Sequence, residues 1–361
     1  MRIIHCADLH LDSGMETNLS KEQASERKQE LLATFAGMID YAGENGVKVI
    51  IIAGDLFDTA NTEQKRIKSR VLDLIKSAAD IDFIYLQGNH DRSDYFATVE
   101  DRPANLKMFG KEWSSFVYGN IVITGCELSK NTRSSVYDEL ILREADTNIV
   151  VLHGQESQYD GKNDAEIINL RKLANRYIDY LALGHIHQYK CEKLDGRGIY
   201  CYSGCLEGRG FDECGDKGFV LLDVEEGVVN HRFIAFSKRN CHEVRVDIGS
   251  CAGEKDIIDA IEEKIEYLPE KDLVKVLLTG ERDADVDVEI TYLKKQFENR
   301  FYLFKLYDKT QIKIDYEAYK NDISLKGEFI RLIEASDLKE EEKQKVIVMG
   351  IRALAGRELE L

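Results

Sequence analysis

The first 240 residues alternate short apolar runs with longer amphipathic segments, and this alternation limits the possible folds more than any other feature. Apolar runs occupy residues 2–6, 47–54 and 82–88. Helical patterns lie between them, at 20–44 and near 62–78. Strands that alternate with helices are typical of layered α/β folds. Five further apolar runs follow at closer spacing, and they begin at Asn120, Asn148, Ile178, Gly198 and Gly218. The closer spacing favours antiparallel neighbours, so we expect a mixed or doubled sheet.

The pattern changes near residue 240. Residues 242–307 read as strand, helix, strand, helix and strand, which predicts a small separate α/β domain. After about residue 325 the pattern is helical only. An apolar stripe opens this tail, and a capping box at Asp337 and Glu340 predicts a second helix. The stripe consists of Phe329, Ile330, Leu332 and Ile333, and the second helix carries Ile347, Ile351 and Leu354. The sequence therefore predicts a domain at 1–240, a small domain at 241–325 and a helical tail at 326–361.

Composition narrows the class of protein. The formal net charge is −17, which counts against a non-specific nucleic-acid coat because such a coat has a basic surface. It does not exclude local contact with nucleic acid, since bound divalent cations invert the local field. No apolar run approaches the roughly 20 residues of a membrane span, and the N-terminus lacks a signal-peptide pattern. We therefore expect a cytoplasmic protein whose eight cysteines are reduced thiols.

Several of the strand-like runs end in residues that commonly bind metals. Five such clusters follow one another along the chain. They consist of Asp8 and His10; Asp55 with Asp58; Asn89, His90 and Asp91; His153; and His185 with His187. Ligand sites of α/β sheets lie at the carboxyl ends of strands. Any single cluster is most simply structural, but five in order on alternating elements predict one shared metal site.

The residue types indicate the chemistry of that site. Two divalent metals about 3.5–4 Å apart can clamp the attacking and leaving oxygens of an in-line displacement. A carboxylate can bridge the two cations, and imidazoles with an amide oxygen can complete their shells. Mixed Asp, Asn and His ligation suits Mn²⁺, Fe²⁺ or Zn²⁺ better than Mg²⁺ or Ca²⁺, which favour oxygen ligands.

The motifs D-x-H, GD, GNHD, H and GHxH, spread over residues 8–187, resemble those of the calcineurin-like metallophosphoesterase superfamily. The resemblance implies a four-layer sandwich with helices outside two facing sheets. It also implies roles for the matched residues. One metal would be held by Asp8, His10 and His187, and the other by Asn89, His153 and His185, with Asp55 as the bridge. His90 would stabilise or protonate the leaving oxygen, oriented by Asp91 behind it.

Within the superfamily the chain resembles the SbcD-type DNA repair exonucleases. The likeness rests on the segments "RIIHCADLHLD" and "AGDLFDT", on "GRGFDE" within residues 202–219, and on the C-terminal helical segment. This resemblance implies an Mn²⁺-dependent exonuclease and endonuclease that acts on DNA ends and hairpins in repair and recombination. It further implies a capping domain, a homodimer, and a tail that binds the coiled coil of an SMC-like ATPase.

Two features of the motifs leave questions open. Some family members carry a histidine in place of Asp58, linked there to exonuclease action on duplex ends, so the strand preference of this chain stays open. Arg92 and Arg209 stand next to motif residues, and arginine suits contact with substrate phosphate as well as ordinary ion pairs. His5, His231 and His242 are expected to be structural or exposed.

Two other function classes compete with the nuclease. A soluble phosphatase or small-molecule phosphodiesterase of the same superfamily is the alternative. Protein phosphatases of this group show an arginine-glycine pair after the second motif, and "GDLFDTAN" lacks it. A non-catalytic scaffold ranks last, because no expected ligand is missing and His90 is present.

Overall fold

The computed structural model describes most of the chain. It covers residues 1–15, 19–58, 65–91, 96, 99, 102–128, 134–159, 167–283, 286, 288–313 and 316–354. The chain forms two compact units, Met1–Asn240 and Cys241–Leu361. Among the described residues, no helix is long and apolar enough to cross a membrane.

The first unit contains two six-stranded mixed sheets. The first sheet has the order β14-β13-β1-β2-β3-β4, formed by Val228–Ala235, Gly218–Glu225, Arg2–Cys6, Val47–Ala53, Asp82–Leu86 and Leu106–Met108. The second has the order β11-β12-β10-β7-β6-β5, formed by Lys190–Lys193, Ile199–Tyr202, Tyr180–Gly184, Thr147–His153, Ile121–Gly125 and Ser114–Tyr118. In the first sheet β1 to β4 are parallel, whereas β13 and β14 are antiparallel. A short ribbon pairs β8 (Gln155–Ser157) with β9 (Ile167–Asn169).

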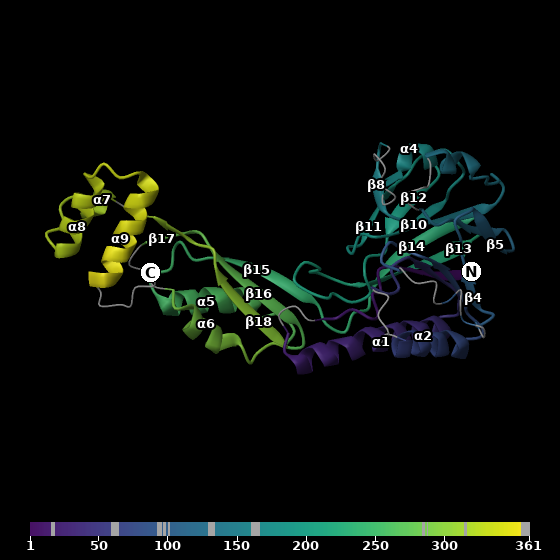
Figure 1. Ribbon diagram of the computed structural model, residues 1–361, viewed down its shortest axis with the longest axis horizontal. Helices are drawn as coiled ribbons and strands as arrows, with labels where there is room; N and C mark the ends of the chain where they lie inside the picture. The colour runs from purple at the N-terminus through teal and green to yellow at the C-terminus, as the bar shows by residue number, and fades with distance from the viewer. Residues whose placement is uncertain are drawn as a thin grey trace. The chain divides into compact units, whose positions relative to one another are not determined.

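Alternation along the strands builds three buried layers between four layers of structure (Figure 1). In β2, Ile50 and Ile52 face the helices α1 (Lys21–Glu44) and α2 (Lys65–Ser77), whereas Val49 and Ile51 face the second sheet. This is the period of two expected of a strand buried on both faces. A third layer packs β7 and β10 against the 3₁₀ helix η2 (Ser134–Glu139) and α4 (Leu170–Leu173). The predicted α/β sandwich with two mixed sheets is therefore confirmed.

Helix α1 begins with a capping box. The Ser20 hydroxyl accepts from the Gln23 amide, and the Gln23 side chain accepts from the Ser20 amide. Its buried face includes Leu31, Phe35 and Met38, which cover the first sheet. The capping box fixes where α1 begins, one residue after the predicted start.

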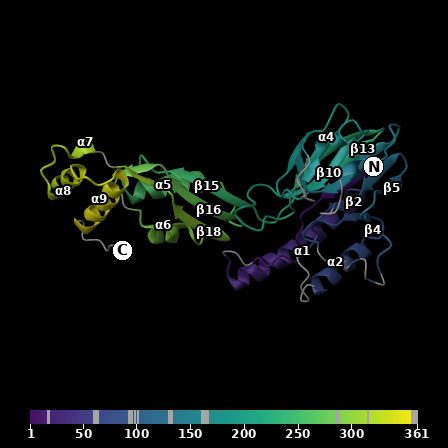
Figure 2. The same ribbon diagram turned by 45° about the horizontal axis from the view of Figure 1, so that its top comes forward.

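The second unit is a three-stranded parallel sheet with helices on it (Figure 2). Its strands and helices are β15 (Cys241–Asp247), α5 (Glu254–Ile265), β16 (Leu273–Thr279), β17 (Glu281–Asp283), α6 (Ile290–Phe297), β18 (Leu303–Asp308), β19 (Gln311–Lys313), α7 (Tyr316–Tyr319), α8 (Leu325–Glu334) and α9 (Glu340–Leu354). Residues of α5 and α6 pack on the sheet in one core. The further boundary predicted at residue 325 stays a prediction.

The tail helices form a core of their own. Ile330, Ile347 and Ile351 are buried together, and Ile312 of β19 packs against them. The capping box predicted at Asp337 is wrong. Helix α9 begins at Glu340, and the backbone amide of Lys339 donates to Glu342 Oε2 over 3.1 Å. The cap therefore lies two residues later than the sequence pattern predicted.

Candidate metal centre

The predicted ligands lie on loops at the carboxyl ends of parallel strands. Asp8 and His10 follow β1, Asp55 follows β2, Asn89 follows β3, His153 ends β7, and His185 and His187 follow β10. The loops after β1 and β2 run side by side, because the Asp8 amide donates to the Gly54 carbonyl over 3.1 Å. The His185 amide donates to both carboxylate oxygens of Asp8, over 2.9 and 3.0 Å. Asp8 therefore joins the loops of the two sheets.

The backbone is left-handed at four of these positions. The φ angle is 53° at Asp8, 42° at His10, 51° at Asp55 and 103° at His185. Positive φ is uncommon for residues other than glycine, costs on the order of 1–3 kcal/mol each, and clusters at functional sites. The fold thus keeps an unfavourable backbone where the metal-type side chains converge.

Two glycines make room for the convergence. A Cβ on Gly54, whose φ is +96°, would lie 2.1 Å from His153 Nδ1. A Cβ on Gly184 would lie 2.0 Å from the Ala53 carbonyl oxygen. These glycines let the two sheets approach at the site, because a Cβ at either position would overlap atoms of the facing sheet.

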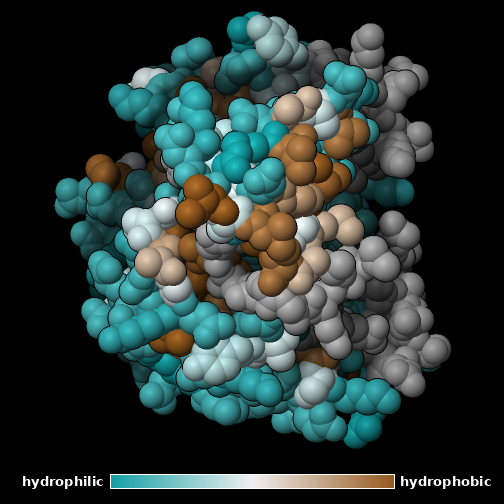
Figure 3. Space-filling view, turned by 90° about the vertical axis from the view of Figure 1, so that its left-hand side faces the viewer, coloured by the Kyte–Doolittle hydropathy of each residue, from teal (hydrophilic) through white to brown (hydrophobic). Residues whose placement is uncertain are grey.

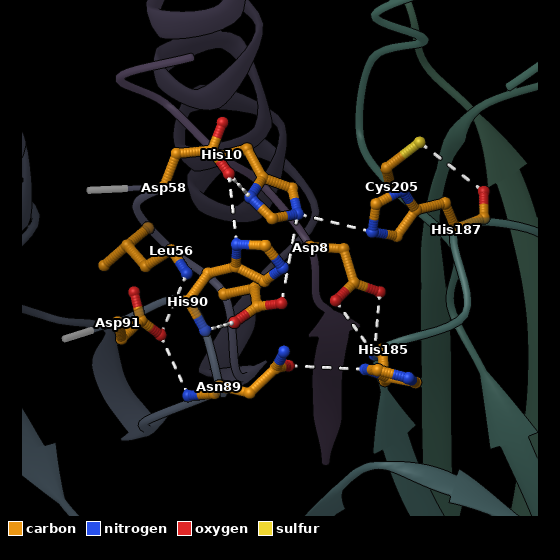
Figure 4. Close-up of polar contacts among 12 residues, drawn as sticks. Asp8, His10, Leu56, Asp58, Asn89, His90, Asp91, His185, His187 and Cys205 are labelled. Atoms are coloured by element: carbon orange, nitrogen blue, oxygen red, sulfur yellow. Dashed lines mark hydrogen bonds and ion pairs between the residues drawn. The ribbon is translucent and has the colours of Figure 1, made fainter. Parts of the chain in front are cut away.

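One cluster consists of Asp8, His10 and His187. Each residue offers a ligand atom, and these atoms all lie within 4.8 Å of one another. The Nε2 atoms of the two histidines are 3.3 Å apart. Asp8 and His10 are buried, and His187 is half-buried. This arrangement brings together the three residues predicted for one metal (Figure 4).

A second cluster consists of Asp8, Asp55 and His153. Asn89 Oδ1 lies 2.9 Å from His153 Nε2 and 3.3 Å from His185 Nδ1, which adds the other two predicted ligands. Asp55 Oδ2 is 3.3 Å from His153 Nε2 and 4.0 Å from His10 Nε2. Asp8 belongs to both clusters, and the Asp55 carboxylate of the second lies 4.0 Å from His10 Nε2 of the first. The role of Asp55 as the bridge stays a prediction.

The hydrogen bonds of the histidines show that this space suits cations. His10 Nδ1 lies 2.6 Å from Asp58 Oδ1, and His187 Nδ1 lies 2.6 Å from Glu213 Oε1. A neutral histidine that donates through Nδ1 carries a lone pair on Nε2. In neutral rings of this kind the two facing Nε2 atoms are both acceptors, and a proton or a metal ion between them satisfies the contact. Carboxylate partners of this kind orient metal-binding histidines in known metal sites.

His153 follows the same pattern. Its Nδ1 lies 2.9 Å from the Ala53 carbonyl oxygen, which can only accept, and its Nε2 faces two further oxygens, Asn89 Oδ1 and Asp55 Oδ2. A proton or a metal ion on Nε2 satisfies this contact. Burial lowers the pKa of His153, but the hydrogen bond and charge of Asp55 outweigh burial and raise it to about 9. The site attracts positive charge, and its nitrogen and oxygen donors fit two divalent metal ions.

His90 lies beside the clusters without joining them. Its side chain is 49% exposed, and its Nδ1 lies 3.7 Å from Asp58 Oδ1. Its backbone amide donates to Asp55 Oδ1 over 2.9 Å. The His90 ring stands edge-on to the His10 ring, with centroids 5.3 Å apart. An exposed imidazole at the rim of the site fits the predicted contact with a leaving oxygen.

Asp91 has different partners from those predicted. Its carboxylate accepts from the backbone amides of Phe57 over 2.8 Å and Gly88 over 2.9 Å. Burial and the neighbouring charge of Asp55 raise the pKa of Asp91 to about 6. Asp91 thus ties the loops after β2 and β3 together, and the carboxylate that faces the His90 ring is that of Asp58 (Figure 4).

The two arginines proposed for phosphate contact have different outcomes. Arg92 lies outside the described residues. Arg209 donates through Nη2 to Glu213 Oε1 over 2.8 Å and through Nη1 to Asp58 Oδ2 over 3.2 Å. Its contact with substrate phosphate stays a prediction. Sequence reasoning missed Glu213, whose only signal is its place in the "GRGFDE" segment.

Comparison with known proteins agrees with this site. A family model described as calcineurin-like phosphoesterase matches residues 1–189, which include all five clusters. The chain is 27% identical over 296 residues to the uncharacterized metallophosphoesterase YhaO of Bacillus subtilis (strain 168), and the match covers 78% of this chain and 72% of that protein.

Two further relatives carry the name DNA double-strand break repair protein Mre11. The chain is 30% identical over 241 residues to the protein of Sulfurisphaera tokodaii, covering 62% of this chain and 59% of that one. It is 25% identical over 392 residues to the protein of Sulfolobus acidocaldarius, covering 99% of this chain and 100% of that one.

Proposed function

The chain belongs to the calcineurin-like phosphoesterase family, and on that premise we propose that it is a two-metal phosphodiesterase that cleaves DNA. The observation that carries the proposal is the convergence of two clusters that share Asp8, with the Asp55 carboxylate of the second within 4.0 Å of His10 Nε2 of the first. Membership of the family makes it a metallophosphoesterase. The DNA substrate, the preference for Mn²⁺ over Fe²⁺ or Zn²⁺, and the partners below are our proposals.

In such a reaction, metal binding and proton donation would fall to different residues. Asp8, His10 and His187 would hold one ion, and Asn89, His153 and His185 the other, with Asp55 between them. When bound, two divalent ions supply Lewis acidity and an activated water. His90 is exposed at the rim, where it would donate a proton to the leaving oxygen. Asp58, 3.7 Å from His90 Nδ1, would hold the ring in place.

Three observations favour DNA over a small substrate. Two of the relatives are named as DNA double-strand break repair proteins, and one match covers 99% of this chain. A second unit with its own core follows the metallophosphoesterase unit. The net charge of −17 disfavours non-specific binding of DNA over the protein surface. Metal ions at the site would nevertheless make the local field positive. The alternative is a phosphatase or small-molecule phosphodiesterase of the same family.

The direct test is cleavage of bis(p-nitrophenyl) phosphate and of a DNA hairpin with Mn²⁺. We expect Asp55→Asn to abolish cleavage and to lower the metal content, because Asp55 lies between both clusters. Asp40→Asn, on an exposed position of α1, is the matched control and should keep both. Full Mn²⁺-dependent activity of the Asp55 variant would refute the two-metal model. A wild-type chain that cleaves the small diester but no form of DNA would favour the alternative.

We also propose that the tail binds the coiled coil of an SMC-like ATPase. Helices α8 and α9 bury Ile330, Ile347 and Ile351 between them but expose other apolar side chains. Leu325 is 72% exposed and Leu332 is 65% exposed. Figure 3 shows hydrophobic residues gathered among hydrophilic ones on the face it views, the side on which Figure 1 draws α7, α8 and α9. Apolar side chains on a helix pair suit a helix-on-coil contact. The homodimer that the resemblance implies stays a prediction.

Removing residues 326–361 tests the tail. We expect the truncated chain to keep metal-dependent cleavage and its melting temperature but to lose ATPase binding in a pull-down. Leu332→Ser in the full chain should weaken the binding, whereas Ile141→Ser, which alters an 87% exposed side chain in the first unit, should not. A truncated chain that unfolds, or that binds the ATPase at full affinity, contradicts the proposal.

A further inference from the structure

The loop at residues 203–217, between β12 and β13, is held firmly from behind. Arg27 of α1 donates to the Gly208 carbonyl over 2.8 Å and to Glu207 Oε2 over 3.2 Å. Thr34 of the same helix donates to Glu207 Oε1 over 2.7 Å. The Arg27 and Glu207 side chains are each only 1% exposed. The loop that carries Arg209 is therefore anchored to the fold by buried charged hydrogen bonds.

The same loop reaches the metal cluster on its other side. Lys217 Nζ donates to the His187 carbonyl over 2.8 Å. Glu213 is 5% exposed and accepts from His187 Nδ1 at 2.6 Å. Arg209 donates to Glu213 through its backbone amide over 2.7 Å, through Nη2 over 2.8 Å and through Nε over 3.1 Å. The loop thus fixes one ligand histidine through both its backbone and its ring.

The Arg209 guanidinium also connects, through Asp58, to His10, the other candidate ligand histidine of the cluster that contains His187. Arg209 Nη1 lies 3.2 Å from Asp58 Oδ2, and Asp58 Oδ1 lies 2.6 Å from His10 Nδ1. The path therefore runs from His187 through Glu213, Arg209 and Asp58 to His10. The contacts of His187 with Glu213, of Glu213 with Arg209 and of Arg209 with Asp58 are charge-assisted hydrogen bonds, the strongest class in proteins. The last contact, between Asp58 and His10, is at a close ion-pair distance.

We propose that Arg209 is a positioning residue, which clamps the Asp58 and Glu213 carboxylates so that both imidazoles of the cluster present Nε2 to one metal ion. The proposal rests on the proposed function and departs from a direct phosphate contact. The Asp58 and Glu213 carboxylates both lie against Arg209, and like charges gathered in a partly buried site repel each other unless a cation lies between them. A planar guanidinium satisfies both at once, whereas a lysine ammonium is a single point charge.

The alternative role as a phosphate ligand fits the contacts less well. Nε, Nη1 and Nη2 of Arg209 each have a carboxylate partner, at 3.1, 3.2 and 2.8 Å. The side chain is only 22% exposed. To contact a phosphate strongly, Arg209 would have to leave Asp58 or Glu213, and the His10 or His187 ring would lose its support.

The test is an Mn²⁺ titration of the full chain, read by calorimetry and by electron paramagnetic resonance. For wild type we expect two tight ions and the spin-coupled spectrum of a pair. For Arg209→Gln we expect one of the two affinities to fall about 10–100-fold, the usual effect of losing a partner of a metal-binding histidine. The spectrum at matched Mn²⁺ should change to that of a single ion, and Arg209→Lys should recover part of the affinity.

Arg197→Gln is the matched control. Arg197 also pairs with a carboxylate, Asp179 at 2.9 Å, in the same unit, but none of its hydrogen bonds reaches a metal-type cluster. We expect this control to lower the melting temperature and to leave both Mn²⁺ affinities within about twofold, because only stability depends on it.

Three results would overturn the inference. Arg209→Gln could keep both affinities and raise only the KM for a diester, which would make Arg209 a substrate ligand. Arg197→Gln could weaken Mn²⁺ equally, which would make the effect one of general stability. A wild-type chain without two bound ions would overturn this inference and the proposed function together. A chain that binds two ions but cleaves no diester would sink the proposed function alone, since the titration uses no substrate.

Discussion

One carboxylate oxygen of Asp58 lies close to two histidine rings. Its Oδ1 lies 2.6 Å from His10 Nδ1 and 3.7 Å from His90 Nδ1. Burial raises the pKa of Asp58, but the hydrogen bond to His10 and the charge of Arg209 outweigh it and lower the pKa. Asp58 therefore stays ionised beside both rings, so that a ligand residue and the proposed proton donor share an anchor.

The position of the His90 side chain outside both clusters predicts how the variant His90→Asn behaves. We expect the variant to bind two Mn²⁺ ions as wild type does, because the His90 side chain belongs to neither cluster. Turnover should fall about 10²–10⁴-fold, the usual contribution of a positioned acid or base. Metal content and kcat measured on the same preparation check both parts. Loss of one ion in this variant would make His90 a ligand.

His5 gives a pH-dependent prediction away from the site. It is buried in β1 with Nδ1 at 2.9 Å from the Tyr180 hydroxyl, and burial lowers its pKa to about 3. An unfolded histidine has a pKa of about 6.5. Between these values the unfolded chain binds a proton that the native chain does not. The free energy of unfolding should therefore decrease as pH falls, by up to about 1.4 kcal/mol per pH unit from this residue.

Chemical denaturation in EDTA between pH 6.5 and 4.5 measures the effect. We expect His5→Gln to reduce the slope of the unfolding free energy against pH by the equivalent of about one bound proton. The reason is that the variant lacks the group that takes up a proton in the unfolded chain. His231→Gln, an exposed position in β14, is the control. Identical slopes for His5→Gln and wild type would show that His5 is not a neutral buried histidine.

The sequence predicted which candidate side chains lie together better than it predicted their hydrogen-bond partners. The seven ligand candidates each follow or end a strand-like run, and parallel strands bring such ends together. Glu213 gave no comparable signal, and Asp58 stood among the five clusters without any indication of its partners. Their contacts depend on the tertiary fold, since Arg209 and Asp58 are 151 residues apart in the chain. For Asp91, the family resemblance implied a contact with His90, whereas its carboxylate accepts from the backbone amides of Phe57 and Gly88.

At the scale of elements, the buried strands were predictable and the edge strands were not. Runs such as residues 47–54 are buried on both faces, so they read as continuous apolar segments. β14 and β5 lie at sheet edges with mostly exposed or half-buried side chains, and their patterns lack a clear period. The short helices η2 and α4 have six and four residues, too few to show helical periodicity.

The close approach of β2 and β7 gives a prediction at this scale. Gly54→Ala would place a Cβ 2.1 Å from His153 Nδ1 at a φ of +96°. We expect a loss of at least about 1–2 kcal/mol in the free energy of unfolding from the backbone alone. Mn²⁺ affinity should fall as well, because His153 must move. Urea denaturation and an Mn²⁺ titration measure the two effects.

Gly43→Ala is the control for this substitution. Gly43 lies in α1, and a Cβ there would meet no atom within 4 Å. Alanine in a helix is favoured over glycine by roughly 0.5–1 kcal/mol. We expect this variant to be as stable as wild type or more so. A Gly54 variant with wild-type stability and metal affinity would show that the two sheets do not need glycine to approach there.

At the scale of the whole molecule, the two units have separate cores. The layers around the first two sheets contain residues of 1–240 only, and the core of the three-stranded sheet contains residues after 240. A domain with its own core folds alone in most cases. We expect residues 1–240 to fold cooperatively and to bind two Mn²⁺ ions, as measured by circular dichroism melting and calorimetry. A fragment that is unfolded without the second unit contradicts the assignment of two independent cores.

The position of β1 in its sheet has a consequence for biosynthesis. β1 pairs with β2 on one side and with β13 on the other, and Arg2 is the partner of Asp223. At roughly 5–20 residues per second, a ribosome needs about 10–40 s to travel from one strand to the other. During that time the nascent chain exposes an open, apolar strand edge. Such edges pair with other chains, so we expect the nascent chain to be most prone to aggregation between the synthesis of β1 and the synthesis of β13.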